Sequence, residues 1–139
     1  EHSAVIASAE KMSTLFGVDL VHVRHLEDAT VDLDHLEKLL LEGAKTLVSL
    51  MHANNEIGVI QPLDKISALC KRYDAVFHSD TVQTMGHYPF SLDSLEIDYV
   101  TCSAHKFHGP KGTGFLYTHP KNKIRSQIVT LDTSHEDKF

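Results

Sequence analysis

The residues best suited to chemistry gather in one short segment, SAHKFHGPKG, at positions 103–112, directly after the strand-like run DYVTC. Lys106 follows a buried strand and precedes a Gly-Pro turn, although a lysine at such a place is most often a plain surface residue. In a pocket its ammonium group would be partly desolvated, which lowers the pKa and favours the neutral amine that forms Schiff bases. The segment therefore predicts amine chemistry at a strand end.

Asp80 ends a second apolar run, AVFHSD. A buried carboxylate is costly unless a cation or several donors face it. One interpretation is an N-cap for the following TVQTMG segment. The other is a carboxylate that holds a proton on a heteroaromatic nitrogen, as in enzymes that use pyridoxal phosphate. Together, Lys106 and Asp80 suggest an imine and its electron sink.

The glycine-rich segment GPKGTG at 109–114 is a weak candidate for a nucleotide-binding loop. It lacks the GxxxxGK[ST] order and leads into a strand instead of a helix. A tight turn that uses the glycines for close backbone approach explains it better. Ser103 and His105, just before the loop, are better placed to contact a phosphate group.

The elements that position these residues alternate along the chain, which predicts an α/β fold of three layers with a mostly parallel sheet. Apolar spacing and end signals predict helices near 3–16, 32–43 and 62–74. Alternating or continuous apolar runs predict strands at 18–24, 45–53, 75–80, 97–102 and 113–119, and we expect the second of these to be covered on both faces. In such sheets ligands bind beyond the carboxyl ends of the strands, where the polar residues of this chain lie.

Composition excludes several other classes of protein. The 139 residues carry a formal charge of −6 and contain no basic run interleaved with aromatic residues, so we expect no nucleic-acid partner. No apolar stretch approaches the length of a membrane span, and the first residues lack a signal-peptide pattern, so we expect no membrane association and a cytoplasmic location. The two cysteines form no framework, and the eleven histidines lack metal-ligand spacing, so we expect no metal site.

Four segments resemble the cysteine desulfurases, the NifS/IscS-like branch of the class-V aminotransferase-fold enzymes that depend on pyridoxal phosphate. They are EHSAV, MHANNEIGVIQP, HSDTVQTMG and SAHKFHGPKGTGFLY, in that order. The resemblance covers residues 1–124 and implies the central part of the cofactor-binding large domain of fold type I. Residues 125–139 form a tail that we cannot align with this family.

The resemblance implies roles for three residues at the reacting part of the cofactor. Lys106 would bind pyridoxal 5'-phosphate covalently and move the substrate's α-proton. Asp80 would pair with the pyridine nitrogen, and His2 would stack on the ring and assist proton transfer. For Asp80 and Lys106 these roles agree with the residue chemistry described above, whereas for His2 the resemblance alone supplies the role.

Four further residues would hold the remaining parts of the cofactor and substrate. By resemblance, Gln83 and Asn55 would reach the ring hydroxyl and the substrate side. Ser103 and His105 would bind the cofactor phosphate. This set completes the cofactor site that the family resemblance implies for the chain.

The implied reaction converts L-cysteine to L-alanine and passes the sulfur, as an enzyme-bound persulfide, to an acceptor such as an iron-sulfur scaffold protein. The full enzymes of this family are homodimers whose active site is completed by a second subunit. The family's nucleophilic cysteine, substrate-binding arginine and phosphate-binding threonine match no residue here. We therefore expect this central piece not to complete sulfur transfer by itself.

Two other interpretations remain open from the sequence. The same fold could serve a selenocysteine lyase, or another class-V lyase or aminotransferase that uses pyridoxal phosphate. A third possibility, from a different class, is a non-catalytic interaction fragment or a histidine-rich metal-binding fragment.

Overall fold

The computed structural model describes residues 1–89 and 91–122, so the predicted tail at 125–139 lies outside the described residues. The fold is α/β, with a four-stranded sheet whose order is β1 (Leu47–Ser49), β2 (Val76–Asp80), β3 (Tyr99–Ser103) and β4 (Gly114–Thr118). The first three strands are parallel, and β4 pairs antiparallel with β3. The predicted mostly parallel sheet is therefore confirmed.

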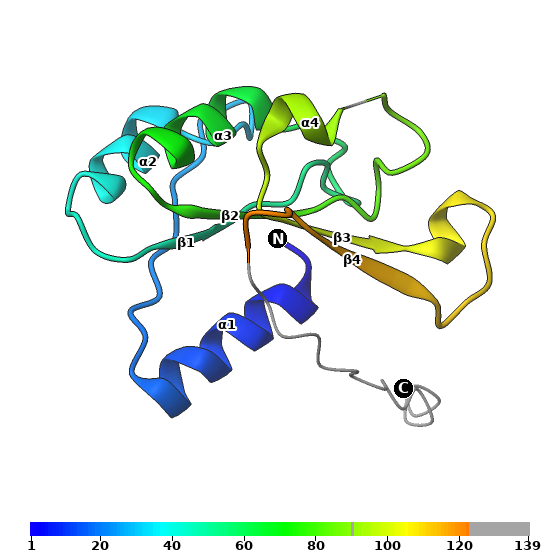
Figure 1. Cartoon of the computed structure of the whole chain (residues 1–139), viewed down its shortest axis with the longest axis horizontal. Helices are drawn as coiled ribbons and strands as arrows, with labels where there is room; N and C mark the ends of the chain where they lie inside the picture. The colour runs from blue at the N-terminus through cyan, green and yellow to red at the C-terminus, as the bar shows by residue number, and fades with distance from the viewer. Residues whose placement is uncertain (90, 123–139) are drawn as a thin grey trace.

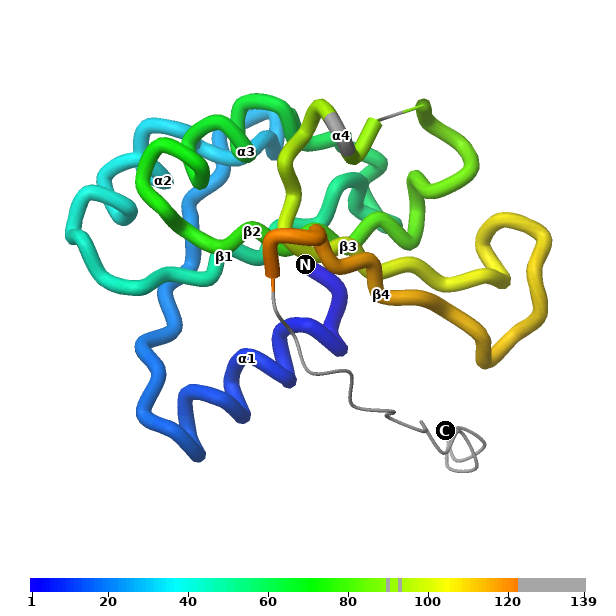
Figure 2. The backbone as a smooth tube through the Cα atoms, in the orientation of Figure 1, coloured from blue at the N-terminus to red at the C-terminus, as the bar shows by residue number. Residues whose placement is uncertain are grey.

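Helices lie on both sides of this sheet (Figure 1). The helices α2 (Leu33–Leu40), α3 (Leu63–Arg72) and α4 (Leu92–Leu95) cover one face. The helix α1 (Ser3–Phe16) lies on the opposite side, and the backbone trace shows a long connection from it to α2 (Figure 2). No residue of α1 is buried, so this helix contributes little to the core. The arrangement has the three predicted layers, of which one is loosely packed.

The core lies between the sheet and the helices α2 and α3. Their apolar stripes face the inward side chains of β1, β2 and β3 because helical and strand periodicities place those side chains on one side. The Asp32 side chain accepts a hydrogen bond from the His35 amide (2.9 Å) and so caps α2, as predicted. The residues that fill this core include Leu36, Leu40, Ile66, Cys70, Phe77 and Val100.

Two details of the predicted fold are wrong. Residues 18–24 form no strand: an alternating pattern needs a partner, and no strand among the described residues pairs with this exposed segment. The strand β1 is shorter than predicted and covered on one face only, with Val48 buried and Leu47 63% exposed. The helix α1, on the opposite side of the sheet, has no buried residue, so the face of β1 that carries Leu47 stays exposed despite its apolar sequence.

The strands β3 and β4 form a hairpin whose connection carries the predicted lysine. It begins with a short 3-10 helix, η1 (Ala104–Phe107). A Cβ atom at Gly109 would lie 2.7 Å from Cβ of Ala104, and one at Gly114 would lie 2.5 Å from the Cys102 carbonyl oxygen. Neighbouring atoms therefore leave no room for a side chain at Gly109 or Gly114, as expected. Gly112 has a different reason to be glycine, since its φ of +75° lies in the left-handed region.

Candidate functional site

The carboxyl ends of β1, β2 and β3 lie at the same edge of the sheet, each strand ending two residues beyond the partner of its neighbour's last residue. Asp80, the last residue of β2, pairs in register with Thr101 of β3. Its carbonyl accepts a hydrogen bond from the His52 amide (2.9 Å), just beyond β1, and the next amide, of Thr81, bonds to the Thr101 carbonyl (3.0 Å). Ser103, the last residue of β3, is two residues beyond Thr101. The end of β3 and the turn that carries Lys106 therefore lie at the same edge of the sheet as Asp80.

The Asp80 residue is 6% exposed. Within residues 1–89 and 91–122 its carboxylate accepts one hydrogen bond, from the Val82 amide to Oδ1 (2.9 Å). This bond begins the turn that follows β2, so the capping interpretation is correct for one oxygen. The second oxygen receives no hydrogen bond in this part of the chain. It remains available to a proton donor on a ligand.

The amino terminus lies beside Asp80. Desolvation by the surrounding protein raises the pKa of the Glu1 carboxyl, and the negative charge of Asp80 raises it further, against a hydrogen bond from the Met51 backbone. His2 is exposed and caps α1, since its Nδ1 accepts a hydrogen bond from the Ala4 amide (3.2 Å). The N-cap of α1 thus brings an imidazole to the neighbourhood of the strand ends.

Three predicted residues lie at the end of β3 and in the turn that follows it. The Ser103 hydroxyl and Nδ1 of His105 are 2.8 Å apart, so these side chains form a local pair. Lys106 is exposed. The described chain therefore does not show the partial desolvation that we expect for this lysine in a pocket.

Gln83 and Asn55 occupy turns beyond the same strand ends. Gln83 is half-buried in the turn that Asp80 begins. Asn55 is exposed in a turn that its neighbour Asn54 stabilises, with Oδ1 accepting from the amides of Glu56 (2.9 Å) and Ile57 (3.2 Å). The side-chain oxygen of Asn54 is thus used in hydrogen bonds to the backbone. Asn55 is therefore the residue of this turn whose carboxamide can contact a ligand.

Two histidines to which the sequence analysis assigned no role lie against the site. His78 joins three strands, with Nδ1 2.8 Å from the Ser49 hydroxyl and Nε2 3.1 Å from that of Thr101. Burial lowers its pKa, and the nearby charge of Asp80 opposes that change. Its position two residues before Asp80, on the same face of β2, is the sequence signal that could have identified it.

His52 is the second of these histidines. It is buried, its Nδ1 lies 2.8 Å from the Thr84 hydroxyl, and burial lowers its pKa. It thereby joins the end of β1 to the turn after β2. Its partner is 32 residues away, so no local pattern could have revealed the contact.

The surroundings of the two cysteines disfavour the thiolate form. Both are buried and free. Burial raises the pKa of Cys70 to about 12 and raises that of Cys102 as well. In residues 1–89 and 91–122, no group of three or more histidine, cysteine, aspartate or glutamate residues is arranged to hold a metal ion. A search of the same residues finds no helix with the length and apolar character needed to cross a membrane.

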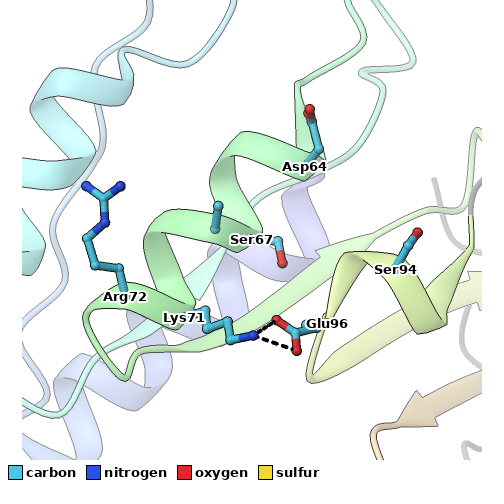
Figure 3. A pocket seen from close by; sticks show the side chains of 7 residues that line it. Asp64, Ser67, Lys71, Arg72, Ser94 and Glu96 are labelled. Atoms are coloured by element: carbon cyan, nitrogen blue, oxygen red, sulfur yellow. Dashed lines mark hydrogen bonds and ion pairs between the residues drawn. The ribbon is translucent and has the colours of Figure 1, made fainter.

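A shallow pocket of about 500 Å³ lies between α3 and α4, on the helical side of the sheet (Figure 3). Lys71 and Glu96 form an ion pair across it, with 2.6 Å between Nζ and Oε2. It contains none of the predicted site residues. The strand-end cluster is therefore the candidate site, and it lies outside this pocket.

The chain is similar to known enzymes over nearly its whole length. The family model described as aminotransferase class-V matches residues 1–131. The cysteine desulfurase IscS of Dictyoglomus turgidum is 43% identical over 128 residues, which cover 92% of this chain and 32% of that protein.

Solved structures show the same relationship. A NifS-like protein from Rickettsia africae superposes with a TM-score of 0.81 at 33% identity, covering 94% of this chain and 35% of that one. A structure described as SspA in complex with cysteine has a TM-score of 0.76 at 28% identity, covering 85% of this chain and 33% of that one. This chain spans about a third of the length of the relatives it matches. A family match over residues 1–131, together with agreement in fold and sequence, identifies the chain as a member of the class-V aminotransferase family.

Proposed function

We propose that the chain supplies the cofactor-binding part of a cysteine desulfurase that depends on pyridoxal 5'-phosphate. The similarity to proteins named cysteine desulfurases supports this proposal. The observation that carries it is the register of Asp80 with Thr101, because it aligns a buried carboxylate with the end of β3, where Ser103 is followed by His105 and Lys106.

The residues at the strand ends fit pyridoxal phosphate. The second carboxylate oxygen of Asp80, which receives no hydrogen bond from the described residues, can accept one from a protonated pyridine nitrogen. The hydroxyl of Ser103 and the imidazole of His105 can both donate to phosphate oxygens. Lys106 is exposed and can reach a bound aldehyde through Nζ.

Each of the remaining residues would orient the cofactor or the substrate. We assign His2 to the face of the ring, as the family resemblance implies; it caps α1 and follows Glu1, whose pKa responds to the charge of Asp80. Gln83 would donate to the ring hydroxyl, and Asn55 would meet the substrate side. Lys106 would also hold and move the substrate's α-proton at Nζ.

Bound pyridoxal phosphate supplies an aldehyde that bonds to amines and a protonated ring that accepts the electron pair released when the α-proton leaves. The overall reaction that we propose transfers the sulfur of L-cysteine to a thiol: L-cysteine and the thiol give L-alanine and a persulfide. The thiol must be in its thiolate form to attack the sulfur of L-cysteine. The buried Cys70 and Cys102, with their raised pKa values, are unsuited to the role, and they are the only cysteines of the 139 residues, so we assign it to a cysteine outside this sequence.

The same reasoning extends to partners and location. We propose L-cysteine as the substrate, and the neighbouring structure that carries cysteine in its description supports that choice. We also propose an acceptor protein such as an iron-sulfur scaffold, a homodimer as the complete enzyme, and a cytoplasmic location. The buried, unpaired cysteines are consistent with a reducing compartment.

Reductive trapping tests the proposal directly. The purified chain is incubated with pyridoxal phosphate, treated with borohydride and digested, and mass spectrometry locates the added phosphopyridoxyl group. We expect it on Lys106. The variant Lys106→Ala should lose that label, whereas Lys111→Ala, which removes an exposed lysine of the same hairpin, should keep it. Equal labelling of several surface lysines, with no preference for Lys106, would contradict the proposal.

A further inference from the structure

The imidazole of His87 bonds to the backbone of the lysine-bearing turn. Its Nε2 lies 2.8 Å from the carbonyl oxygen of Lys106, although the two residues are 19 positions apart. A carbonyl oxygen can only accept a hydrogen bond, so Nε2 of His87 must carry the hydrogen. No backbone amide among the described residues donates to this carbonyl. The side chain of His87 therefore holds a backbone group next to the predicted reactive amine.

A second contact packs the two turns together. Gly86 adopts a φ of +78°, and a Cβ atom there would lie 3.0 Å from Cβ of Phe107. The residues that precede His87 and follow Lys106 are thus in close contact. This packing fixes the distance between the turns, and the hydrogen bond from His87 fixes their relative orientation.

The turn that carries His87 is itself tied to Asp80. The His87 amide donates to the Thr84 carbonyl (3.0 Å), and the Thr84 hydroxyl lies 2.8 Å from Nδ1 of His52. The His52 amide in turn donates to the Asp80 carbonyl (2.9 Å). A continuous series of hydrogen bonds therefore runs from Asp80 through the buried side chains of His52 and Thr84 to the carbonyl of Lys106.

The other hydrogen bonds of the turn around Lys106 are local: the amides of His108 and Gly109 donate to the Ala104 carbonyl, and the Ala104 amide donates to the Thr113 carbonyl. The turn is the short 3-10 helix η1, and it ends at His108, whose φ of +67° is unfavourable for a residue with a side chain. Lys106 itself is exposed. A short turn of this kind opens easily unless side chains from elsewhere hold it.

We propose that His87 is a positioning residue that sets the place of Lys106 relative to Asp80 by donating a hydrogen bond from Nε2 to the Lys106 carbonyl. The role in binding the cofactor rests on the function proposed above, whereas the ordering of the turn does not. His87 is exposed, so its substitution leaves the core intact.

Four variants test this proposal. His87→Ala removes the donor, and His87→Gln retains an N–H group at the position of Nε2. His87→Asn places its amide near the position of Nδ1, too short to reach the carbonyl. His22→Ala, on the exposed segment after α1, is the matched control. Urea unfolding of all four establishes that global stability is unchanged.

The first measurement is hydrogen exchange, followed by mass spectrometry, of the peptide that spans 103–110. We expect faster exchange of its amides in His87→Ala and His87→Asn, with exchange restored to the original rate in His87→Gln and unchanged in His22→Ala. The second measurement is the rate at which pyridoxal phosphate is trapped on Lys106 by borohydride. It should fall roughly three- to tenfold in the Ala and Asn variants, as for one lost hydrogen bond, and recover in the Gln variant.

The two measurements separate the two proposals. If the original chain shows no label on Lys106, the proposed function fails, while the exchange data still test the positioning role. Unchanged exchange in His87→Ala would overturn the positioning role, even if Lys106 is labelled. Failure of His87→Gln to restore the exchange that His87→Ala accelerates would also overturn it, because the hydrogen bond would then not be the cause.

Discussion

The hydroxyl of Ser103 lies 2.8 Å from Nδ1 of His105, so the last residue of β3 is paired with the residue that precedes Lys106. Each of these groups can turn a hydrogen toward an anion because a hydroxyl rotates and an imidazole can be protonated. The pair therefore forms a small donor site beside the lysine. We propose that this pair is the part of the strand-end cluster that distinguishes a phosphorylated ligand from one without phosphate.

Substitution of this pair should affect phosphate recognition alone. We expect Ser103→Ala to weaken the binding of pyridoxal 5'-phosphate roughly ten- to hundredfold, as for a lost hydrogen bond to a charged group. Binding of pyridoxal, which lacks the phosphate, should be unchanged. Equilibrium titration monitored by absorbance measures both affinities, with Ser94→Ala on α4 as the control. An equal loss for the two ligands would contradict the phosphate assignment.

Asp80→Asn should separate the two roles of this side chain. An asparagine retains an oxygen that accepts the hydrogen bond from the Val82 amide, so the urea unfolding midpoint should change little. It removes the negative charge that would stabilise a protonated ring nitrogen, so affinity for pyridoxal phosphate should fall at least about tenfold. Should the affinity stay the same, Asp80 would be a capping residue only.

Asp98 should make the free energy of unfolding depend on pH in the acid range. Burial acts to raise its pKa, but the Phe77 amide, the Asn122 side chain and the Lys121 ammonium group outweigh that effect and hold the pKa below its usual value. The folded state therefore favours the carboxylate. The resulting stabilisation is present above the unfolded pKa of about 3.9 and is lost as the pH falls through the folded value.

Urea unfolding between about pH 6 and about pH 2 measures this dependence. We expect Asp98→Asn to be less stable than the original chain near pH 6, by about 1–3 kcal/mol, because a buried charged acceptor is replaced. The difference should shrink on acidification. Asp19→Asn, on the exposed segment after α1, should follow the original chain throughout. A difference that is independent of pH would show that the charge of Asp98 is not responsible.

The cysteines should resist modification in the folded chain. Since the pKa of Cys70 is raised to about 12 and that of Cys102 is also raised, both are thiols at neutral pH, and both are buried. A chromogenic disulfide reagent should therefore react slowly with the native chain and rapidly with both thiols in urea. Rapid reaction of either cysteine in the native state would reopen its candidacy as the sulfur acceptor.

Local patterns predicted the helices and the sheet well because their signals lie within a few residues. The apolar stripe that ends at Gly17 and the Asp32 cap each identify an element without reference to the remainder of the chain. The alternation at residues 18–24 failed because a strand also requires a partner. Periodicity describes which side chains share a face, but it does not supply the hydrogen-bonding neighbour.

The same distinction applies to the site. Asp80 and Lys106 could be singled out because Asp80 ends one apolar strand and Lys106 lies shortly after the next, and parallel strands end at one edge. The contact of His87 with Lys106 and that of His52 with Thr84 join residues 19 and 32 positions apart, and they depend on tertiary packing. The exposure of Lys106 also depends on what covers it, which its neighbours in sequence do not determine.

The antiparallel return of β4 places a limit on how the lysine-bearing turn can evolve. Residues on β4 alternate between the two faces of the sheet, and Tyr117, opposite Val100, packs against the core. A slip of β4 by one residue against β3 would invert this alternation and expel Tyr117 from the core. A change in the length of the turn must therefore be absorbed within residues 104–113, whereas a substitution there can alter ligand preference and leave the register of β4 unchanged.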